Sequence, residues 1–510
     1  MQSALQIAAA QHGLRFGPDP STHNRCTIGG MIGNNACGSR ALAYGRTSDN
    51  VVALDVMTAA GRRIRLDGSE SDRIPELAEL RRVIHTGLAT IRTEFGRFGR
   101  QVSGYSLEHL LPENGFDVPR TLVGSEGTLA IVVGATLRLV ELPRHRVLVV
   151  LGYPDMASAA DAAPGLLHHR PTACEGLDSR IIDTVRARHG TDAVPPLPRG
   201  AGWLFLELAA ESPAAALAAA DRVVSDADAQ DSRVVSDADQ AIALWRIRED
   251  GAGLAGRTPD GTPAHPGWED SAVPPQRLGA YLRDLDRLVA EHNLTGMPYG
   301  HFGEGCVHLR LDFPLRRPDG RKQLRDFLLD AGRLVAGYGG SMSGEHGDGR
   351  ARSELLPLMY SPAALDLFSQ VKAAFDPDDL LNPGVLVSPR PVDEDVRATA
   401  VRPVRQALGF GYRHDGGDFT TAVHRCSGVG KCRADATQTG GVMCPSYLAT
   451  SEEKDSTRGR ARVLQEMVNG SLVGGGWQAP EVHAALDLCL ACKACSSECP
   501  AGVDMATYKA

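Results

Sequence analysis

The sequence lacks long apolar runs and any excess of basic residues. Among its 510 residues no stretch approaches the ~20 uncharged, apolar residues that a membrane-spanning helix needs. Its 54 Lys and Arg face 62 Asp and Glu, for a net charge of -8, and no basic run is interleaved with aromatic residues. Nucleic acid is therefore not an expected partner. We expect a cytoplasmic protein, with peripheral docking at the inner face of a membrane as the alternative.

Cysteines are few and unevenly placed. Of the 11, seven lie between Cys426 and Cys499. An odd total with clustering near one end suits metal ligation in a reducing compartment better than a disulfide framework.

Composition divides the chain into regions, and its length predicts two or three domains. Residues 1–142 are Gly-rich, with short β-branched runs such as VVALDVM that are typical of a mixed α/β unit. In residues 143–388, strand-like runs such as VLVVLGYP alternate with Ala-rich helical runs, as in an α+β domain. Residues 389–425 are charged and Pro-rich, which favours an exposed linker, and the cysteine-rich residues 426–510 follow.

Two glycine-rich segments stand out in the first region. CTIGGMIGNNACGSR precedes a predicted strand, and VGSEGTLAIVV is a turn that opens into a strand pair. Glycines let backbone N–H groups approach a ligand closely, and asparagines add short donors. A tight turn is the alternative interpretation, because an isolated glycine-rich loop is a weak signal.

The segment MPYGHFGEGCVHLRLDF predicts a loop that leads into a strand. Residues 307–313 alternate between apolar and polar, so that His308, Arg310 and Asp312 would share one face of this strand. His301 lies at an odd offset from His308, and the glycines between them can turn the backbone and bring the two rings together.

Converging imidazoles with an added carboxylate suit a divalent metal ion. The carboxylate is suggested by Glu345 in SMSGEHGDGR, where glycines again surround the polar residues. The alternative is that His308 only caps a strand and that Glu345 pairs with Arg350.

The last cysteines form the most specific motif. They reproduce the bacterial ferredoxin spacing C-x2-C-x2-C-x3-C-P, in which three thiolates hold one cluster and the fourth reaches the next. A zinc site is the alternative, but four cysteines so closely spaced before a proline favour iron–sulfur. The motif consists of Cys489, Cys492, Cys495 and Cys499.

The partner motif is irregular. Pairing across the two motifs predicts one complete [4Fe–4S] site, with the ligands Cys444, Cys489, Cys492 and Cys495. The other site keeps Cys426, Cys432 and Cys499, which suits a [3Fe–4S] cluster, or a [4Fe–4S] cluster with a fourth ligand such as His424 or solvent.

Together, the glycine-rich segments resemble the FAD-binding domain of the vanillyl-alcohol oxidase and p-cresol methylhydroxylase family, in its D-lactate, glycolate and D-2-hydroxyglutarate dehydrogenase branch. The resemblance runs from about Gly13 to the end of the chain. It implies an α+β fold with an FAD-binding domain, an FAD-linked oxidase substrate domain and a small α-helical ferredoxin-like domain. Relatives carry a further lobe before Gly13 and a further cysteine-rich domain after Cys499, so the resemblance predicts truncation at both ends.

The resemblance assigns flavin contacts to both glycine-rich segments and to the later segment LLNPGVL. The residues are Gly29, Gly30, Asn34, Gly38, Tyr44, Gly45, Asp49, Gly124, Ser125, Glu126, Gly127, Thr128, Ile131 and Asn382. For Asn382 a helix stop is an equal alternative.

The resemblance also implies a zinc-like ion with the ligands His301, His308 and Glu345. His346 would act as the base, and Arg248 would hold the substrate carboxylate through its planar fork. Arg310 stands where some relatives carry Asn, and a second cation there would favour a diacid.

The leading hypothesis is an FAD-dependent dehydrogenase that oxidises D-lactate, glycolate or D-2-hydroxyglutarate to the 2-oxo acid. A chelated metal lowers the pKa of the substrate hydroxyl, so that an imidazole can take its proton. Flavin accepts a hydride while clusters pass single electrons, which implies a quinone, cytochrome or electron-transfer protein as the acceptor. The alternatives are an oxidase of sugars or aromatic alcohols and an electron-transfer subunit of a larger flavoprotein complex.

Overall fold

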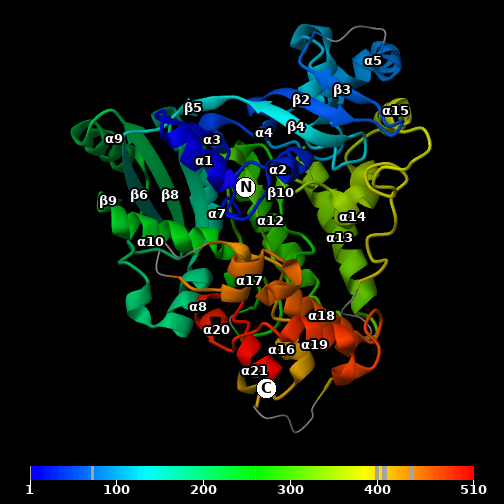
Figure 1. The fold of residues 1–510 in the computed structure, drawn as a ribbon. Helices are drawn as coiled ribbons and strands as arrows, with labels where there is room; N and C mark the ends of the chain where they lie inside the picture. The colour runs from blue at the N-terminus through cyan, green and yellow to red at the C-terminus, as the bar shows by residue number, and fades with distance from the viewer. Residues whose placement is uncertain are drawn as a thin grey trace. The chain divides into compact units, whose positions relative to one another are not determined.

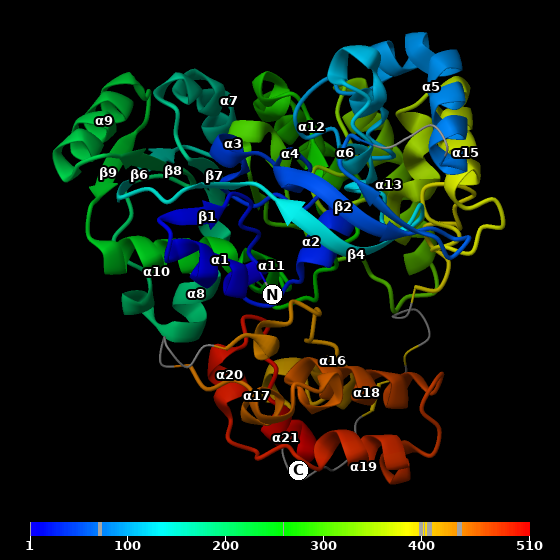
Figure 2. The ribbon, with the colours of Figure 1, turned by 45° about the horizontal axis from the view of Figure 1, so that its top comes forward.

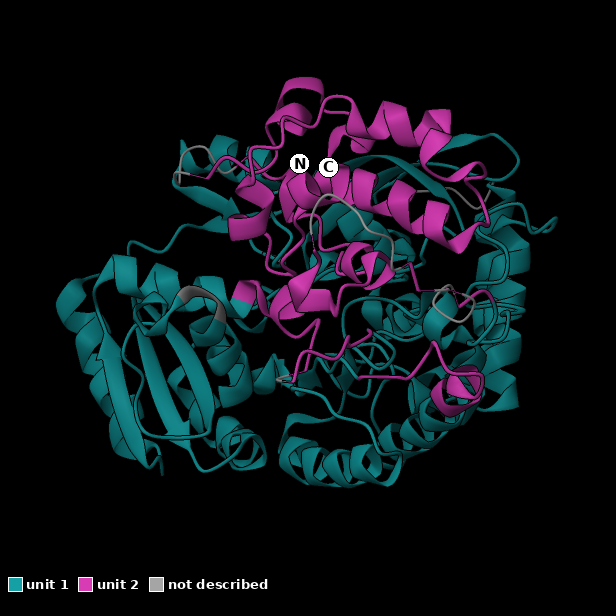
Figure 3. Cartoon of the chain, turned by 90° about the horizontal axis from the view of Figure 1, so that it is seen from below, with its two compact units in different colours: residues 1–248, 266–311, 325–394 teal, residues 249–265, 312–324, 395–510 magenta. Residues whose placement is uncertain are grey.

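The computed structural model describes residues 2–69, 74–258, 260–396, 401, 403–404, 411–435 and 441–510. These residues form two compact units, coloured separately in Figure 3. Unit 1 comprises residues 1–248, 266–311 and 325–394, and unit 2 comprises residues 249–265, 312–324 and 395–510.

The N-terminal part of unit 1 is built on a three-stranded antiparallel sheet of order β3-β2-β4. The strands are β2 (Val51–Met57), β3 (Arg63–Leu66) and β4 (Ile131–Leu137). Helices α5 (Pro75–Glu94) and α15 (Pro362–Phe375) lie side by side near this sheet (Figure 1). They cross closely because Gly87 leaves no Cβ to collide with Leu367.

Apolar periodicity explains why this layer forms. In α5, Leu77, Leu80 and Ile84 recur at helical spacing and are buried in one core with Leu54 of β2. Each such side chain contributes about 1.5–3 kcal/mol when it is fully buried.

The second sheet of unit 1 is a five-stranded antiparallel sheet of order β11-β7-β8-β6-β9. Its strands are β6 (His145–Tyr153), β7 (Ala173–Asp178), β8 (Gly202–Ala210), β9 (Asp231–Val235) and β11 (Tyr299–Gly300). Helices α7 (Met156–Leu166) and α9 (Pro213–Asp226) pack on it (Figure 2), and α12 (Leu278–Glu291) packs on α7. Strand β7 is buried along its whole length, so a charged residue there needs a partner.

Two short strand pairs complete the described strands. They are β1 (Leu14–Phe16) with β5 (Leu139–Glu141), and β10 (Ser271–Ala272) with β12 (Cys306–Val307). The remaining helices before residue 353 are α1 (Gln2–Ala10), α2 (Ile28–Asn34), α3 (Ala41–Tyr44), α4 (Thr47–Asn50), α6 (Val118–Leu122), α8 (Ser179–His189), α10 (Ala238–Glu249), α11 (Gly251–Leu254), α13 (Gly320–Gly337) and α14 (Gly349–Arg352).

The described C-terminal part of unit 2 is helical. Its helices are α16 (Phe419–Val423), α17 (Pro445–Thr450), α18 (Thr457–Asn469), α19 (Pro480–Leu486), α20 (Ala494–Glu498) and α21 (Met505–Lys509). Phe419, Leu464 and Tyr508 are buried in a core that also contains cysteines. The predicted linker 389–425 therefore ends in a packed helix, because Phe419 and Val423 give α16 an apolar face. Residues 397–400, 402 and 405–410 of that linker lie outside the described residues.

The predicted α+β class is confirmed, as are the strands predicted from runs such as VLVVLGYP, which forms most of β6. The predicted strand 307–313 is wrong in its extent. Strand β12 ends at Val307, and only isolated bridges follow, at His308 and Leu311. Both the polar and the apolar side chains from His308 to Leu311 are buried, so this segment has no solvent face. The described helices are all too short or too polar to cross a bilayer.

Candidate active site and iron–sulfur pocket

Three imidazoles of unit 1 meet at one carboxylate oxygen. Oε1 of Glu345 lies 3.1 Å from Nε2 of His301, 3.4 Å from Nε2 of His308 and 3.4 Å from Nε2 of His346. His301, His308 and Glu345 are buried, whereas the His346 side chain is 44% exposed. The cluster thus has one open side, at His346.

A tight turn brings His301 and His308 together. His301 follows β11 directly, and the turn after it ends at Gly305 with a φ of 78°. A side chain at Gly305 would overlap the carbonyl oxygen of Val273, so both conformation and space require glycine here. The two rings consequently lie 5.2 Å apart at 86°.

Asp270 shapes the loop that carries Glu345 and His346. Its Oδ2 accepts hydrogen bonds from Ser343 Oγ at 2.7 Å and from the backbone N–H groups of residues 344, 345 and 346 at 3.0, 3.1 and 2.8 Å. Asp270 is fully buried. The loop is therefore held rigidly by a carboxylate that the sequence analysis did not single out.

The second oxygen of Glu345 faces the flavin-type segment. Oε2 accepts hydrogen bonds at 3.1 Å from Arg100 Nη1 and at 3.1 Å from the backbone N–H of Gly38. Arg100 is fully buried and also pairs with Glu304 at 2.5 Å. Gly38 therefore contacts the histidine cluster.

Glu175 supports the cluster from strand β7. Its Oε1 lies 2.8 Å from His301 Nδ1, and its Oε2 lies 2.5 Å from Arg248 Nη2. Burial by itself would raise the pKa of Glu175, but Arg248 and His301 lower it to about 2. A carboxylate on the far nitrogen of an imidazole is a common second-sphere arrangement in metal sites.

Replacing Glu175 with Gln should weaken the binding of Zn²⁺ to the protein by about 10–100-fold, because His301 loses the partner that orients it. The measurement is a Zn²⁺ titration against a chelator of known affinity. Glu291→Gln, at the exposed end of α12, is the matched control. An unchanged affinity in Glu175→Gln would contradict the role of Glu175 in orienting His301 as a ligand.

Two buried guanidinium groups, those of Arg248 and Arg310, lie near Tyr299. Arg248 lies 5.1 Å from the centre of the Tyr299 ring, and Arg310 makes two hydrogen bonds of 3.2 Å to Glu269. Within the described chain, Nε of Arg248 and Nη1 of Arg310 are buried without a hydrogen-bond partner. Buried donors of this kind normally have partners, so both are available to an anionic ligand.

The charges around the cluster determine where its protons sit. Burial would lower the pKa of His301, but Glu175 and Glu345 raise it to about 9. Partial burial likewise opposes protonation of His346, yet Asp270, Glu345 and Glu269 raise its pKa to about 9. Burial lowers the pKa of His308. A cation bound to these nitrogens must therefore displace protons.

The donor set fits a divalent metal ion. Two groups of the described residues have ligand atoms within 4.8 Å of one another. The more exposed one consists of His168, His169 and Asp226, and the group at this site consists of Asp270, His308, Glu345 and His346. The predicted set shares His308 and Glu345 with this group, and it adds His301 in place of the other two. Mixed imidazole and carboxylate donors suit zinc and similar ions.

The two glycine-rich segments lie against each other and against the Glu345 loop. The N–H groups of Gly124 and Glu126 donate to the carbonyls of residues 32 and 33 at 2.8 Å each. Asn34 Nδ2 donates to the His346 carbonyl at 2.5 Å, and Asn382 Nδ2 donates to the Glu126 carbonyl at 2.7 Å.

Glu126 connects the second segment to helix α14. Its carboxylate accepts the N–H groups of residues 348 and 349 at 2.7 and 2.8 Å. With the contacts above, the structure brings together the predicted residues Asn34, Gly38, Glu126 and Asn382 beside the histidine cluster.

Open glycines fit a cofactor at this surface. Gly29 and Gly33 lie in α2, and a Cβ on either would meet nothing within 4 Å. Neither packing nor backbone conformation therefore requires glycine there, whereas close approach of a flavin nucleotide would. Gly30 lies in the same exposed turn, and Gly127 is exposed with a φ of 70°.

Other residues of the predicted flavin set make contacts with neighbouring residues of the protein. Asp49 accepts the Arg46 N–H at 2.9 Å and pairs with Arg120, and Thr128 shares a hydrogen bond of 2.7 Å with Tyr105. A side chain on Gly45 would crowd Asp49. The rest of the set consists of half-buried Tyr44, half-buried Gly124, buried Ser125 and half-exposed Ile131.

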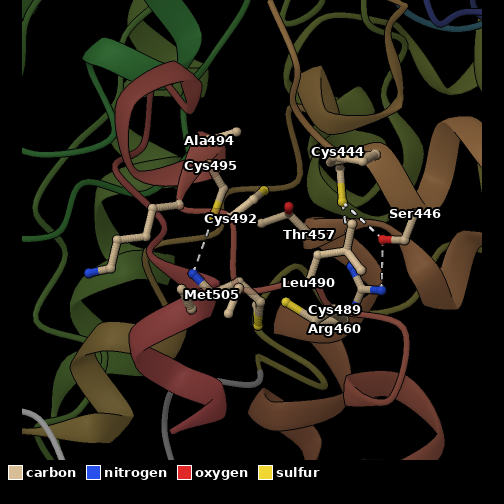
Figure 4. A pocket seen from close by; sticks show the side chains of 14 residues that line it. Cys444, Ser446, Thr457, Arg460, Cys489, Leu490, Cys492, Ala494, Cys495 and Met505 are labelled. Carbon is tan, nitrogen blue, oxygen red and sulfur yellow. Dashed lines mark hydrogen bonds between the residues drawn. The ribbon is translucent and has the colours of Figure 1, made fainter.

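In unit 2, four cysteines line one pocket (Figure 4). They are Cys444, Cys489, Cys492 and Cys495, the set that the sequence pairing predicted for a complete cluster site. Cys495 Sγ accepts the Met505 N–H at 3.3 Å, and N–H groups directed at sulfur are typical of iron–sulfur sites. Four thiols around one pocket are the donors that a [4Fe–4S] cluster requires.

The other three cysteines of unit 2, Cys426, Cys432 and Cys499, lie close to one another. Burial raises the pKa of Cys426 to about 12, with Cys499 and Cys432 close enough to act in the same direction. His424 Nδ1 donates to the Thr420 carbonyl at 2.7 Å, which leaves Nε2 as an acceptor.

Sequence reasoning missed four charged residues of the site: Arg100, Glu175, Glu269 and Asp270. A signal existed for Glu175, since it is a charged residue inside the apolar run that forms β7. Arg100 carried no comparable signal, because its role depends on a contact with a loop 245 residues away.

Three family models match the chain. "FAD linked oxidases, C-terminal domain" matches residues 142–386, "FAD binding domain" matches residues 2–67, and "4Fe-4S dicluster domain" matches residues 418–503. The chain is thus similar to FAD-binding and FAD-linked oxidase domains and to a 4Fe-4S dicluster domain. These matches confirm the prediction of FAD and of 4Fe-4S clusters as cofactors.

Among curated relatives, a D-2-hydroxyglutarate dehydrogenase of Pseudomonas putida is 29% identical, covering 100% of this chain and 56% of the relative. A D-2-hydroxyglutarate dehydrogenase of Escherichia coli is 28% identical over 98% of this chain and 54% of the relative. A D-lactate dehydrogenase of Archaeoglobus fulgidus is 29% identical over 75% of this chain and 74% of the relative. The chain thus spans about half the length of the first two.

Proposed function

We propose that this chain carries the substrate-oxidising site of an FAD-dependent dehydrogenase of D-2-hydroxy acids, together with its first iron–sulfur relay. The observation that carries the proposal is the meeting of three imidazoles at Glu345 beside two buried guanidinium groups with free donors. The relatives named above include both D-2-hydroxyglutarate and D-lactate dehydrogenases.

FAD, the metal ion and His346 have different roles in the proposed reaction. When bound, FAD supplies the hydride acceptor and a divalent metal ion polarises the substrate hydroxyl. His346 is the base for the hydroxyl proton, because its ring is the exposed member of the cluster. The carboxylates around His346 raise its pKa. A divalent metal ion bound at Glu345 would offset their negative charge and lower this pKa, so that His346 could accept a proton.

Arg248 and Arg310 bind and orient the substrate. Each offers a free N–H group in a buried place, where a charge-assisted hydrogen bond is strong. Two such groups near Tyr299 suit a substrate with two carboxylates, and we therefore propose D-2-hydroxyglutarate rather than D-lactate or glycolate. The electron acceptor is proposed to be a quinone, cytochrome or electron-transfer protein.

Arg310→Leu tests the substrate class. In the FAD-loaded enzyme, anaerobic flavin bleaching by D-2-hydroxyglutarate should slow roughly 10–100-fold, the value of one charge-assisted hydrogen bond. Bleaching by D-lactate should change much less, because D-lactate has no second carboxylate. Arg333→Leu, with a side chain 59% exposed, is the control.

An equal loss with both acids would contradict the assignment of Arg310 to the second carboxylate. Because Arg310→Leu leaves Glu269 without its bidentate partner, the double variant with Glu269→Gln keeps the site neutral. Removing both partners is less disruptive than removing one.

A further inference from the structure

Arg460 of α18 is a buried cation at the pocket of four cysteines. Its Nη1 donates to Cys444 Sγ at 3.4 Å, its Nη2 to Ser446 Oγ at 2.9 Å and its Nε to the Ala485 carbonyl at 2.8 Å. The side chain is among the largest fully buried ones, at 1% exposure. Figure 4 shows Arg460 and Cys444 linked at one side of the pocket.

The charge of Arg460 has no acidic partner. Across the described residues, no carboxylate lies within 4.0 Å of this guanidinium, and its acceptors are a carbonyl, a hydroxyl and a sulfur. An isolated buried charge costs several kcal/mol unless an opposite charge compensates for it. The pocket must therefore provide negative charge when the protein is in its working form.

A cluster with four thiolate ligands provides that charge. The [4Fe–4S] core with four cysteine thiolates is an anion, and each electron that it accepts makes it more negative. Arg460 donates directly to Sγ of Cys444, which is one of the proposed ligands. A cation in contact with a sulfur atom favours the thiolate form that binds metal.

The neighbouring Arg458 is a natural comparison. It lies in the same helix, and its backbone N–H donates to Cys432 Sγ at 3.3 Å. Its side chain pairs with Glu453 at 2.7 Å and is 32% exposed. Its charge is therefore compensated and partly screened, unlike that of Arg460.

We propose that Arg460 raises the reduction potential of the cluster held by Cys444, Cys489, Cys492 and Cys495. The step concerned is the transfer of one electron. The electron would pass from the reduced flavin to the cluster and then to the acceptor, and no covalent bond would form or break. The guanidinium stabilises the reduced state more than the oxidised state, because the attraction grows with the cluster's negative charge. The inference rests on the proposed ligand set for this cluster.

The test is a redox titration of the purified holoprotein, followed by electron paramagnetic resonance. Arg460→Gln keeps hydrogen-bonding groups but removes the charge. It should reduce the equilibrium constant for one-electron reduction of one cluster about tenfold, a shift of about 59 mV to lower potential. Arg460→Lys should stay close to the wild-type potential, and Arg458→Gln should leave this cluster unchanged.

Iron analysis distinguishes failure of the inference about Arg460 from failure of the proposed ligand set. If Arg460→Gln keeps its iron and the cluster signal but the midpoint does not move, the inference is wrong while the ligand set stands. If Arg460→Gln loses the cluster, Arg460→Lys decides, because a tenfold loss with the charge retained would also overturn the inference. Retention of the same cluster by Cys444→Ser would instead refute the ligand set.

Discussion

Replacing His346 with Ala is expected to slow anaerobic flavin reduction by the hydroxy acid ~10²–10⁴-fold, the usual contribution of a general base. His346 is the exposed imidazole of the cluster, with Nε2 3.4 Å from Glu345 Oε1. The measurement is stopped-flow bleaching of the bound flavin at saturating substrate. Zn²⁺ affinity is measured in parallel to separate loss of a base from loss of a ligand.

His85→Ala is the matched control, because His85 lies on the exposed face of α5. It should bleach at the wild-type rate. Unchanged bleaching in His346→Ala would eliminate His346 as the base. A slow variant with a large loss of Zn²⁺ affinity would assign His346 to the metal instead, as the geometry of its ligand group allows.

Replacing Cys444 with Ser is expected to remove one cluster and to reduce acceptor-linked turnover to background. The reason is that Cys444 completes the four-thiol pocket, and flavin electrons then have no path through it. Anaerobic bleaching of the flavin should persist, since the substrate site lies in residues of unit 1. Iron analysis and steady-state reduction of an artificial dye provide the two measurements.

Cys26→Ser serves as the control, because Cys26 is a free cysteine outside both predicted cluster sites. It should retain its iron and its turnover. Wild-type turnover in Cys444→Ser would mean that electrons leave the flavin without this cluster.

The regular elements were predictable because their apolar spacing is local information. Residues Leu77, Leu80 and Ile84 define the buried face of α5 without reference to any other element. The strand predicted at 307–313 was wrong in extent because its environment depends on distant residues, which local spacing does not encode. Its alternating pattern is real, but the polar side chains His308 and Arg310 face buried carboxylates instead of water.

The site was predictable only where glycine and histidine occur together. Those residues indicated a turn around His301 and a loop around Glu345, and the structure brings the two together. The supporting residues required the fold itself. Asp270 adopts a φ of 102°, unusual outside glycine, and it holds the loop through backbone contacts that no sequence spacing encodes.

The two oxygens of the Glu345 carboxylate have different partners, and this limits which metal ion the histidine cluster can bind. Oε2 is already occupied by Arg100 and by the Gly38 amide, so only Oε1 faces the histidines. Glu345 can thus act as a monodentate ligand alone. Calcium, which favours many oxygen ligands, is poorly matched to such a site, whereas an ion that prefers nitrogen and low coordination number is well matched.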